Sequence, residues 1–232
     1  MAHERFHYKS VEEIQAKAAE LGVSLPFAQD TRVLAQPLSF GGVTVPNRLG
    51  IAPMEGADSL ADGSPSEYTL RRYVKDAEGG SAVIWFEAIS IVPEGRSGRT
   101  QLYLCRENLD QYKRFTQAIK EAGLRANGFA PWLVMQANHS GRYSNPDNKP
   151  APLIACRNPY YEKFRAADDS CIVSDDYLKG LEEKFGEAAA LAKEAGFDAV
   201  DIKACHGYLL AELNAAWLRA DLTHKETQEF AR

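Results

Sequence analysis

The sequence predicts an α/β fold in which parallel strands alternate with helices. Four times along the chain, a short apolar run of strand length is followed by a segment whose apolar residues recur at helical spacing. This order favours βα units over an antiparallel sheet, because parallel neighbours need a helix-length connection between them. The 232 residues are 45% hydrophobic and 25% charged, as expected for a globular domain that buries a core. A doubly wound sheet and a barrel both remain open at this level.

The N-terminal segment predicts a short amphipathic helix that precedes the sheet. Ser10 and Glu13 have the spacing of a capping box, and apolar residues follow at helical intervals up to Gly22. The stretch LSFGGVTVPNRLGIAPM then predicts a small hairpin that leads into the first strand. We therefore expect a leader helix and linker at residues 1–30 and one larger domain at residues 31–232.

The remaining elements follow in strand–helix order. The expected strands are 49–53, 82–87, 131–136 and 199–203. The expected helices are 66–77, the segment NLDQYKRFTQAIKEAG that ends at Gly123, and the long segment from Ser174 to Gly196. Residues 144–173 are rich in Pro, Asn, Asp and Arg and show no period. A connection of this length inside a compact domain predicts a functional, lid-like loop.

Composition and charge exclude several classes of protein. The net charge is −5, from 27 basic and 32 acidic residues, and no basic run marks a nucleic-acid surface. The N-terminus has no apolar stretch of signal-peptide type. The most apolar segment, SAVIWFEAISIVP, is too short to span a membrane and contains Glu87. The four cysteines lie far apart without a CxxC pair, which indicates reduced thiols in a cytoplasmic protein.

Common site motifs are also missing from the sequence. There is no GxGxxG after a strand, no GxxxxGK[ST] and no GxSxG, which argues against a dinucleotide fingerprint, a P-loop and a hydrolase elbow. His139 and His206 have no third ligand at a helpful spacing, so we expect no metal site.

Polar groups nevertheless gather where each expected strand ends. They are Glu55, Glu87, Gln136 and Lys203, with His206 and Tyr208 shortly after the last of them. In parallel α/β folds ligands bind at the carboxyl ends of the strands, because the loops converge there. The sequence therefore predicts a ligand site at this edge of the sheet.

Four ordered motifs resemble those of a known family. PLSFGGVTVPNRLGIAPM, FEAISIVPEGR, QANHSGR and IKACHGYLLAEL are similar, in this order, to motifs of the old yellow enzyme family of FMN-dependent NAD(P)H oxidoreductases. The resemblance covers residues 34–213 and implies a (β/α)8 TIM-barrel fold with FMN at the carboxyl ends of the strands. It also implies hydride transfer from NADH or NADPH, through the flavin, to a carbonyl-conjugated C=C bond of an enone or enoate.

The resemblance implies five cofactor-binding residues. Pro53 and Met54 match residues that pack along the flavin, and Glu55 matches a position at the edge of its ring. Ala88 matches a small residue that leaves room beside the ring, and Gln136 matches an amide that hydrogen-bonds its pyrimidine side.

The resemblance also implies three catalytic residues. Lys203 and His206 stand where the family places a pair that holds the substrate carbonyl, and Tyr208 matches the proton donor. These roles are chemically sound, because donors stabilise the negative charge that grows on a carbonyl oxygen and a neutral phenol can act as an acid.

Lys203 departs from the family, which has histidine at this position. Strand alternation places Asp201 and Lys203 on one face, about 6–7 Å apart. We therefore expect Asp201 to pair with Lys203 and keep it charged.

Three other polar residues have simpler interpretations. His139 is expected to order its own loop, and Arg142 is interpreted as a surface or lid arginine. Glu87 lies in an apolar strand, where an unpaired charge is costly, so we expect a structural arginine partner.

The length of the chain is the larger departure from the resemblance. A barrel of this kind takes about 250 residues, whereas the sequence shows only four strand–helix units. The tail RADLTHKETQEFAR lacks the glycine pair that the family has after HGYL, and we expect the FMN phosphate contacts to lie outside the chain. A fragment of a longer enzyme, an inactive truncated product and a half-barrel that associates through its sheet edges into a homo-oligomer all remain open.

Overall fold

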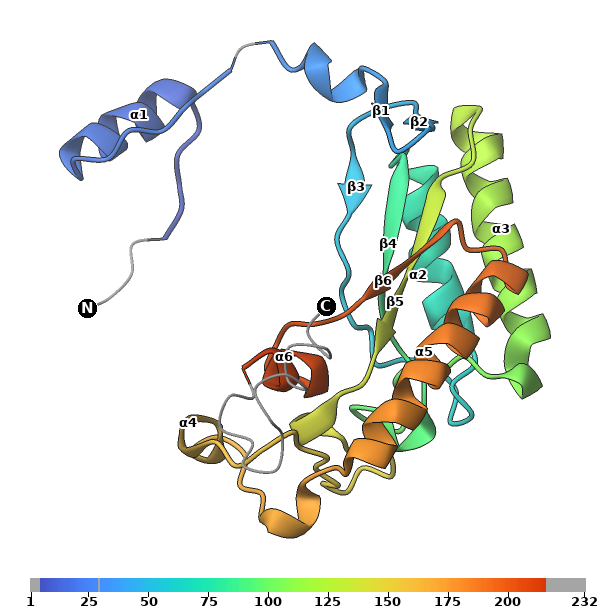
Figure 1. Cartoon of the computed structure of the whole chain (residues 1–232). Helices are drawn as coiled ribbons and strands as arrows, with labels where there is room; N and C mark the ends of the chain where they lie inside the picture. Colours follow the sequence, from blue (N-terminus) through green and yellow to red (C-terminus); the bar gives the residue numbers. More distant parts are fainter. Residues whose placement is uncertain (1–4, 29, 216–232) are drawn as a thin grey trace.

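A computed structural model describes residues 5–28 and 30–215 (Figure 1). Its centre is a parallel sheet in the order β3-β4-β5-β6. The strands are β3 (Gly50–Ile51), β4 (Val83–Ser90), β5 (Trp132–Asn138) and β6 (Ala199–Ile202). The predicted α/β class with parallel strands is confirmed. Within the described residues the sheet is open, so closure into a barrel stays a prediction, and the tail at residues 219–232 lies outside this part.

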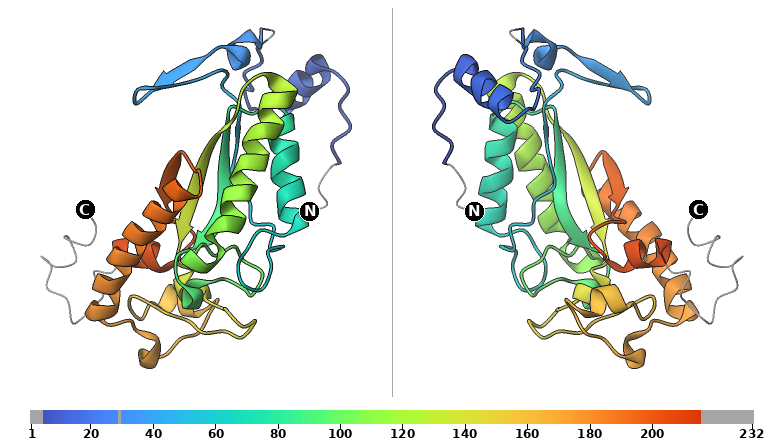
Figure 2. Two further views of the ribbon diagram at one scale, coloured as in Figure 1. Left: turned by 90° about the vertical axis from the view of Figure 1, so that its right-hand side faces the viewer. Right: turned by 90° about the vertical axis from the view of Figure 1, so that its left-hand side faces the viewer.

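Three long helices cover one face of the sheet (Figures 1 and 2). They are α2 (Glu67–Glu78), α3 (Leu109–Asn127) and α5 (Asp175–Glu194). An aromatic cluster joins the layers: the Phe86 ring on β4 stacks on Tyr73 with centroids 4.2 Å apart, and meets Phe115 and Phe197 edge-on. On the other side of the sheet Trp85 and Ile202 are partly or largely exposed. The core therefore lies between the sheet and these helices, and the opposite face is open.

Serine caps set the starts of two of these helices. The Ser66 side chain accepts from the Thr69 amide to begin α2, and Ser174 accepts from the Tyr177 amide to begin α5. The predicted end of α3 at Gly123 is wrong, because the helix continues to Asn127 and ends at Gly128 with φ +78°. Gly123 instead lets α3 approach β5 closely: a Cβ there would lie 2.6 Å from the Pro131 Cδ.

The N-terminal elements also match their predictions. Ser10 caps α1 (Val11–Glu20) by accepting from the Glu13 amide at 3.3 Å. β1 (Leu38–Phe40) and β2 (Val43–Val45) form the expected antiparallel hairpin. Among the helices of residues 5–28 and 30–215, none has the length and apolarity that a membrane span requires.

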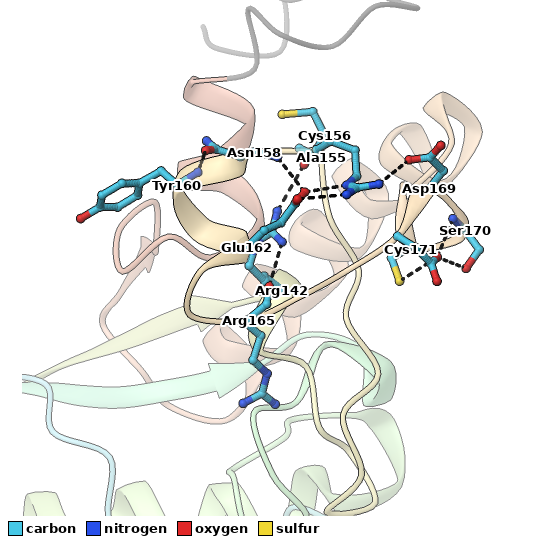
Figure 3. Close-up of polar contacts among 12 residues, drawn as sticks. Arg142, Ala155, Cys156, Asn158, Tyr160, Glu162, Arg165, Asp169, Ser170 and Cys171 are labelled. Atoms are coloured by element: carbon cyan, nitrogen blue, oxygen red, sulfur yellow. Dashed lines mark hydrogen bonds and ion pairs between the residues drawn. The ribbon is translucent and has the colours of Figure 1, made fainter.

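Residues 144–173 form an ordered segment rather than a featureless loop. They contain α4 (Pro159–Glu162), and a bridge between Ile154 and Ile172 closes the segment at its base. Arg157 pairs with Glu162 at 2.6 Å and Asp169 at 2.9 Å, within the network that Figure 3 draws. The segment is therefore ordered by the bridge at its base and by local side-chain contacts, with a single short α-helix and no long regular element.

Candidate functional site

The carboxyl ends of β4, β5 and β6 carry a row of paired side chains. Strand register places Ala88 beside Gln136, and Gln136 beside Asp201. The Gln136 Nε2 donates to Asp201 Oδ2 at 2.8 Å, and Trp85 Nε1 donates to the same oxygen at 3.2 Å. The predicted cofactor residues Ala88 and Gln136 are therefore brought together at one edge of the sheet, with Asp201 orienting the amide.

Lys203 does not form the predicted pair with Asp201. Neutral donors on β4 and β5 bond the Asp201 carboxylate, and no Asp201–Lys203 ion pair occurs among the described residues. Lys203 is buried, with 8% of its surface exposed, and its Nζ lies 4.9 Å from the centre of the Tyr208 ring. Lys203 therefore contacts the predicted proton donor instead.

Tyr208 and His206 follow β6 in a tight loop that leads into α6 (Leu209–Asn214). Their ring centroids are 6.0 Å apart. Burial raises the pKa of Tyr208 to about 12, and the nearby Glu55 carboxylate adds to this shift. The phenol is therefore protonated at neutral pH. His206 is exposed, has the left-handed φ of +63°, and lies with Nδ1 3.0 Å from the Cys205 Sγ.

Glu55 is held by a residue that sequence reasoning missed. The Gln101 Nε2 donates to Glu55 Oε1 at 2.8 Å and to the Ala88 carbonyl at 3.1 Å, while the Gln101 Oε1 accepts from the Ser97 amide. Although Glu55 is exposed as a whole residue, protein atoms crowd its carboxyl, and this desolvation raises its pKa while the Lys203 charge lowers it. Gln101 lies in an irregular segment, where neither helical nor strand period marks it.

A cavity of about 360 Å³ lies at this edge of the sheet. Its lining includes Glu55, Glu87, Gln101, Tyr143, Asn145, Arg165 and Tyr208. Of the predicted site residues, Glu55 and Tyr208 line the cavity. The others lie outside its lining, and Met54 is 77% exposed beyond the end of β3. Tyr143 directly follows the QANHSGR motif and Arg165 lies in the segment 144–173, and sequence reasoning did not assign either residue to the site.

Glu87 has the arginine partner that its burial predicts. The Arg72 Nη1 lies 2.8 Å from Glu87 Oε1, and the Tyr73 hydroxyl and the Gly56 amide donate to the same carboxylate. Glu87 is 1% exposed. This saturated carboxylate fixes the loop after β3, which carries Glu55, against β4.

His139 and Arg142 are structural. The His139 Nδ1 accepts from the Gly141 amide at 3.0 Å, so its Nε2 carries the proton toward the Tyr177 hydroxyl, and the prediction that it orders its own loop is confirmed. Burial lowers the pKa of His139 to about 4. The interpretation of Arg142 as a surface arginine is wrong: it is fully buried, and its Nε donates to Glu212 Oε1 at 2.6 Å.

The residues at the strand ends fit the ring of the FMN that the sequence resemblance implies. Lys203 is 8% exposed as a residue, and its ammonium has no hydrogen bond to any described residue, so it can donate to an acceptor on a bound ligand. The Gln136 amide keeps its oxygen without a donor among the described residues, since only its nitrogen is bonded. A flavin pyrimidine ring offers both carbonyl acceptors and an N–H donor, so the donor set matches it. No three metal-ligating side chains gather within the described part of the chain.

A family model, curated proteins and solved structures match this chain. The family model for the NADH:flavin oxidoreductase / NADH oxidase family matches residues 33–217. An NADPH dehydrogenase of Bacillus pumilus (strain SAFR-032) is 29% identical over 181 residues, which are 77% of this chain and 50% of that protein. A solved old yellow enzyme homologue from Zymomonas mobilis is 25% identical with a TM-score of 0.62, over 78% of this chain and 50% of its own. Morphinone reductase in complex with tetrahydroNAD has a TM-score of 0.68 at 21% identity, and the match covers 85% of this chain and 58% of that protein. The chain spans about half the length of the curated relatives it matches.

Proposed function

The chain belongs to the NADH:flavin oxidoreductase / NADH oxidase family, and on this premise we propose that it acts as an FMN-dependent oxidoreductase with NAD(P)H as reductant. The proposed substrate is a carbonyl-conjugated alkene. The observation that carries the proposal is the contact of Lys203 with Tyr208 at the end of β6, beside the Gln136 amide. The solved old yellow enzyme homologue and morphinone reductase support the same fold for these strand–helix units.

Tyr208 is the proposed proton donor. When bound, FMN supplies hydride transfer between NAD(P)H and the alkene. Reduction of the alkene also needs one proton, and the Tyr208 phenol lines the cavity with a pKa raised to about 12. It therefore keeps its proton at neutral pH until a developing carbanion takes it.

Lys203 and His206 are the proposed donors to the substrate carbonyl. Negative charge grows on that oxygen as the alkene is reduced, and a fixed donor lowers the barrier because it needs no reorganisation. Lys203 brings a full positive charge from a buried position, whereas His206 is exposed on the loop between β6 and α6. Pro53, Met54, Glu55, Ala88 and Gln136 are the proposed contacts of the flavin.

Binding and turnover test this proposal separately. Titration of FMN with the purified chain, followed by flavin fluorescence and visible absorbance, is expected to show binding that weakens in Gln136→Ala. With 2-cyclohexenone and NADPH, Tyr208→Phe is expected to retain flavin reduction and lose alkene reduction about 100-fold or more. A chain that binds no added FMN, or a Tyr208→Phe variant with full alkene turnover, contradicts the proposal.

A second candidate function is non-catalytic association through the sheet edges. It is favoured by the open sheet, whose end strands β3 and β6 each have one neighbouring strand in the described residues, and by the exposure of Trp85 and Ile202. Light scattering after size exclusion distinguishes the two: a flavin-free dimer supports association, whereas a flavin-binding monomer excludes it.

A further inference from the structure

The lid segment places one guanidinium in the candidate cavity without a charge partner. Arg165 is half-buried and lines the cavity together with Tyr143 and Tyr208. Its guanidinium carbon lies 5.8 Å from the centre of the Tyr143 ring. Among the described residues it makes no ion pair, unlike Arg72, Arg142 and Arg157. Figure 3 shows its side chain projecting away from the ion-pair network of the segment.

The backbone of Arg165 is anchored even though its side chain is unpaired. The fully buried Arg142 donates to the Arg165 carbonyl at 3.2 Å and to the Cys156 carbonyl at 3.3 Å. The position of the Arg165 backbone is therefore set by a buried group, independently of what its own guanidinium contacts. The anchored backbone and the Tyr143 ring restrict where the guanidinium can lie, which reduces the freedom that it loses when it binds a ligand.

The same segment packs directly on the loop that carries Tyr208. A Cβ at Gly207 would lie 3.1 Å from the Tyr161 Cε1, so the ring of Tyr161 rests on the glycine before Tyr208. This contact couples the lid to the loop and explains how Arg165 and Tyr208 come to line one cavity.

The two acidic groups of the cavity lining already have partners within the protein. Glu87 is bonded to Arg72 and two neutral donors, and Glu55 accepts from Gln101. Arg165 therefore remains as a partly desolvated cation whose planar fork matches the oxygens of a carboxylate or phosphate.

We propose that Arg165 forms an anion subsite of this cavity, and that the substrate is an unsaturated compound bearing an anionic oxygen group. The volume of about 360 Å³ and the two tyrosines suit a small planar acid. The assignment of the anion to an alkene substrate rests on the proposed function. The same chemistry could be met by a phosphate of the nicotinamide nucleotide, and the test separates these sources.

Calorimetric titration of the whole 232-residue chain tests the subsite without any catalytic readout. The probes are trans-cinnamate, its neutral counterpart trans-cinnamamide, and nicotinamide mononucleotide. Cinnamate is expected to bind about tenfold or more tighter than cinnamamide, because hydrogen bonds to charged groups are the strong ones. Arg165→Gln is expected to abolish this preference, and Arg165→Lys to retain part of it. Lys163→Gln removes an equal charge from an exposed residue outside the cavity lining and is expected to change nothing.

The outcomes separate the two ligands and the two proposals. If Arg165→Gln weakens only the mononucleotide, the subsite holds a nucleotide phosphate and the anionic alkene is excluded. If it weakens neither probe while circular dichroism shows a folded chain, the subsite is overturned. FMN binding is measured in the same samples, so a chain that prefers cinnamate but binds no FMN keeps the subsite and loses the proposed function.

Discussion

Gln136 and Asp201 are register partners on β5 and β6, and their side chains are joined by a hydrogen bond of 2.8 Å from the amide Nε2 to the carboxylate Oδ2. Gln136 is 6% exposed, so this bond fixes an almost buried amide. The carboxylate was expected to serve Lys203. It accepts a hydrogen bond from the Gln136 amide instead, which leaves the ammonium of Lys203 available to a ligand.

A double-mutant cycle measures this relationship. Gln136→Ala and Asp201→Ala are expected to show a coupling of about 1 kcal/mol in the free energy of unfolding, because one net hydrogen bond joins them. The cycle of Asp201→Ala with Lys203→Met is expected to show none, because no ion pair links the two. Urea denaturation at pH 7 supplies both values. Additive effects for Gln136 with Asp201 would contradict a stabilising hydrogen bond between them, and strong coupling of Asp201 with Lys203 would restore the original pairing.

The buried ion pair between Arg142 and Glu212 is expected to dominate the stability of the lid. Their Nε–Oε1 distance is 2.6 Å, and the two side chains are 0% and 1% exposed. Arg142→Met leaves a buried carboxylate unpaired and is expected to cost about 3–5 kcal/mol. The double variant Arg142→Met/Glu212→Leu is expected to be more stable than Arg142→Met alone, as chemical denaturation can show. A double variant that is less stable than Arg142→Met alone would mean that the pair contributes more than charge neutralisation.

The regular elements were predictable because local chemistry determines them. Ser66 and Ser174 cap helices, and the apolar runs of β4 and β5 have strand length and are buried in the sheet. The end of α3 was not predictable, because Gly123 is explained by the approach of Pro131, eight residues further along the chain.

The site was predictable only near the carboxyl ends of the strands. Gln136 lies near the end of β5 and Tyr208 lies shortly after β6, and the motifs around them mark this end of the sheet. Gln101 and Arg165 reach the cavity from irregular segments, whose course depends on distant contacts such as the hydrogen bond from Arg142 to the Arg165 carbonyl. Strand alternation placed Asp201 correctly within the sheet. It could not show that Gln136 and Trp85, rather than Lys203, bond its carboxylate.

Stability is expected to fall on acidification because of His139. Its pKa is lowered to about 4 in the folded chain, against about 6.5 in an unfolded one. Between these values only the unfolded state binds the proton. His139 therefore does not lower the free energy of unfolding above pH 6.5, and it lowers this free energy progressively as the pH falls toward 4. The full loss is about 3 kcal/mol. Urea titrations from pH 7 to pH 4 measure it, and His139→Gln is expected to flatten this part of the profile. An unchanged slope in His139→Gln would contradict the assignment.

Lys203→Met is expected to lower kcat for alkene reduction by about 100-fold, as loss of one oxyanion donor does. It is also expected to lower the reduction potential of bound FMN, because a positive charge near the ring favours its electron-rich form. Steady-state kinetics and equilibration with a reference dye measure the two effects. Lys179→Met, an exposed position on α5, serves as the charge-matched control. If Lys203→Met leaves both quantities unchanged, Lys203 serves neither substrate nor flavin.

Gly141 joins the two loops that meet at the site, and its substitution is expected to disturb both. It has φ +57°, and a Cβ there would lie 2.4 Å from the Leu209 amide nitrogen, directly after Tyr208. The backbone of α6 cannot yield as a flexible side chain would, so Gly141→Ala is expected to cost about 2 kcal/mol or more through strain and overpacking. Gly180→Ala, in the exposed interior of α5 with no atom within 4 Å, is the matched control and is expected to stabilise by about 0.5–1 kcal/mol. Thermal unfolding of both variants gives the comparison.

Since the clash falls on the residue that follows Tyr208, Gly141→Ala is also expected to change the tyrosine's near-ultraviolet circular dichroism. A stable Gly141→Ala chain with an unaltered spectrum would show that the two loops are not rigidly joined.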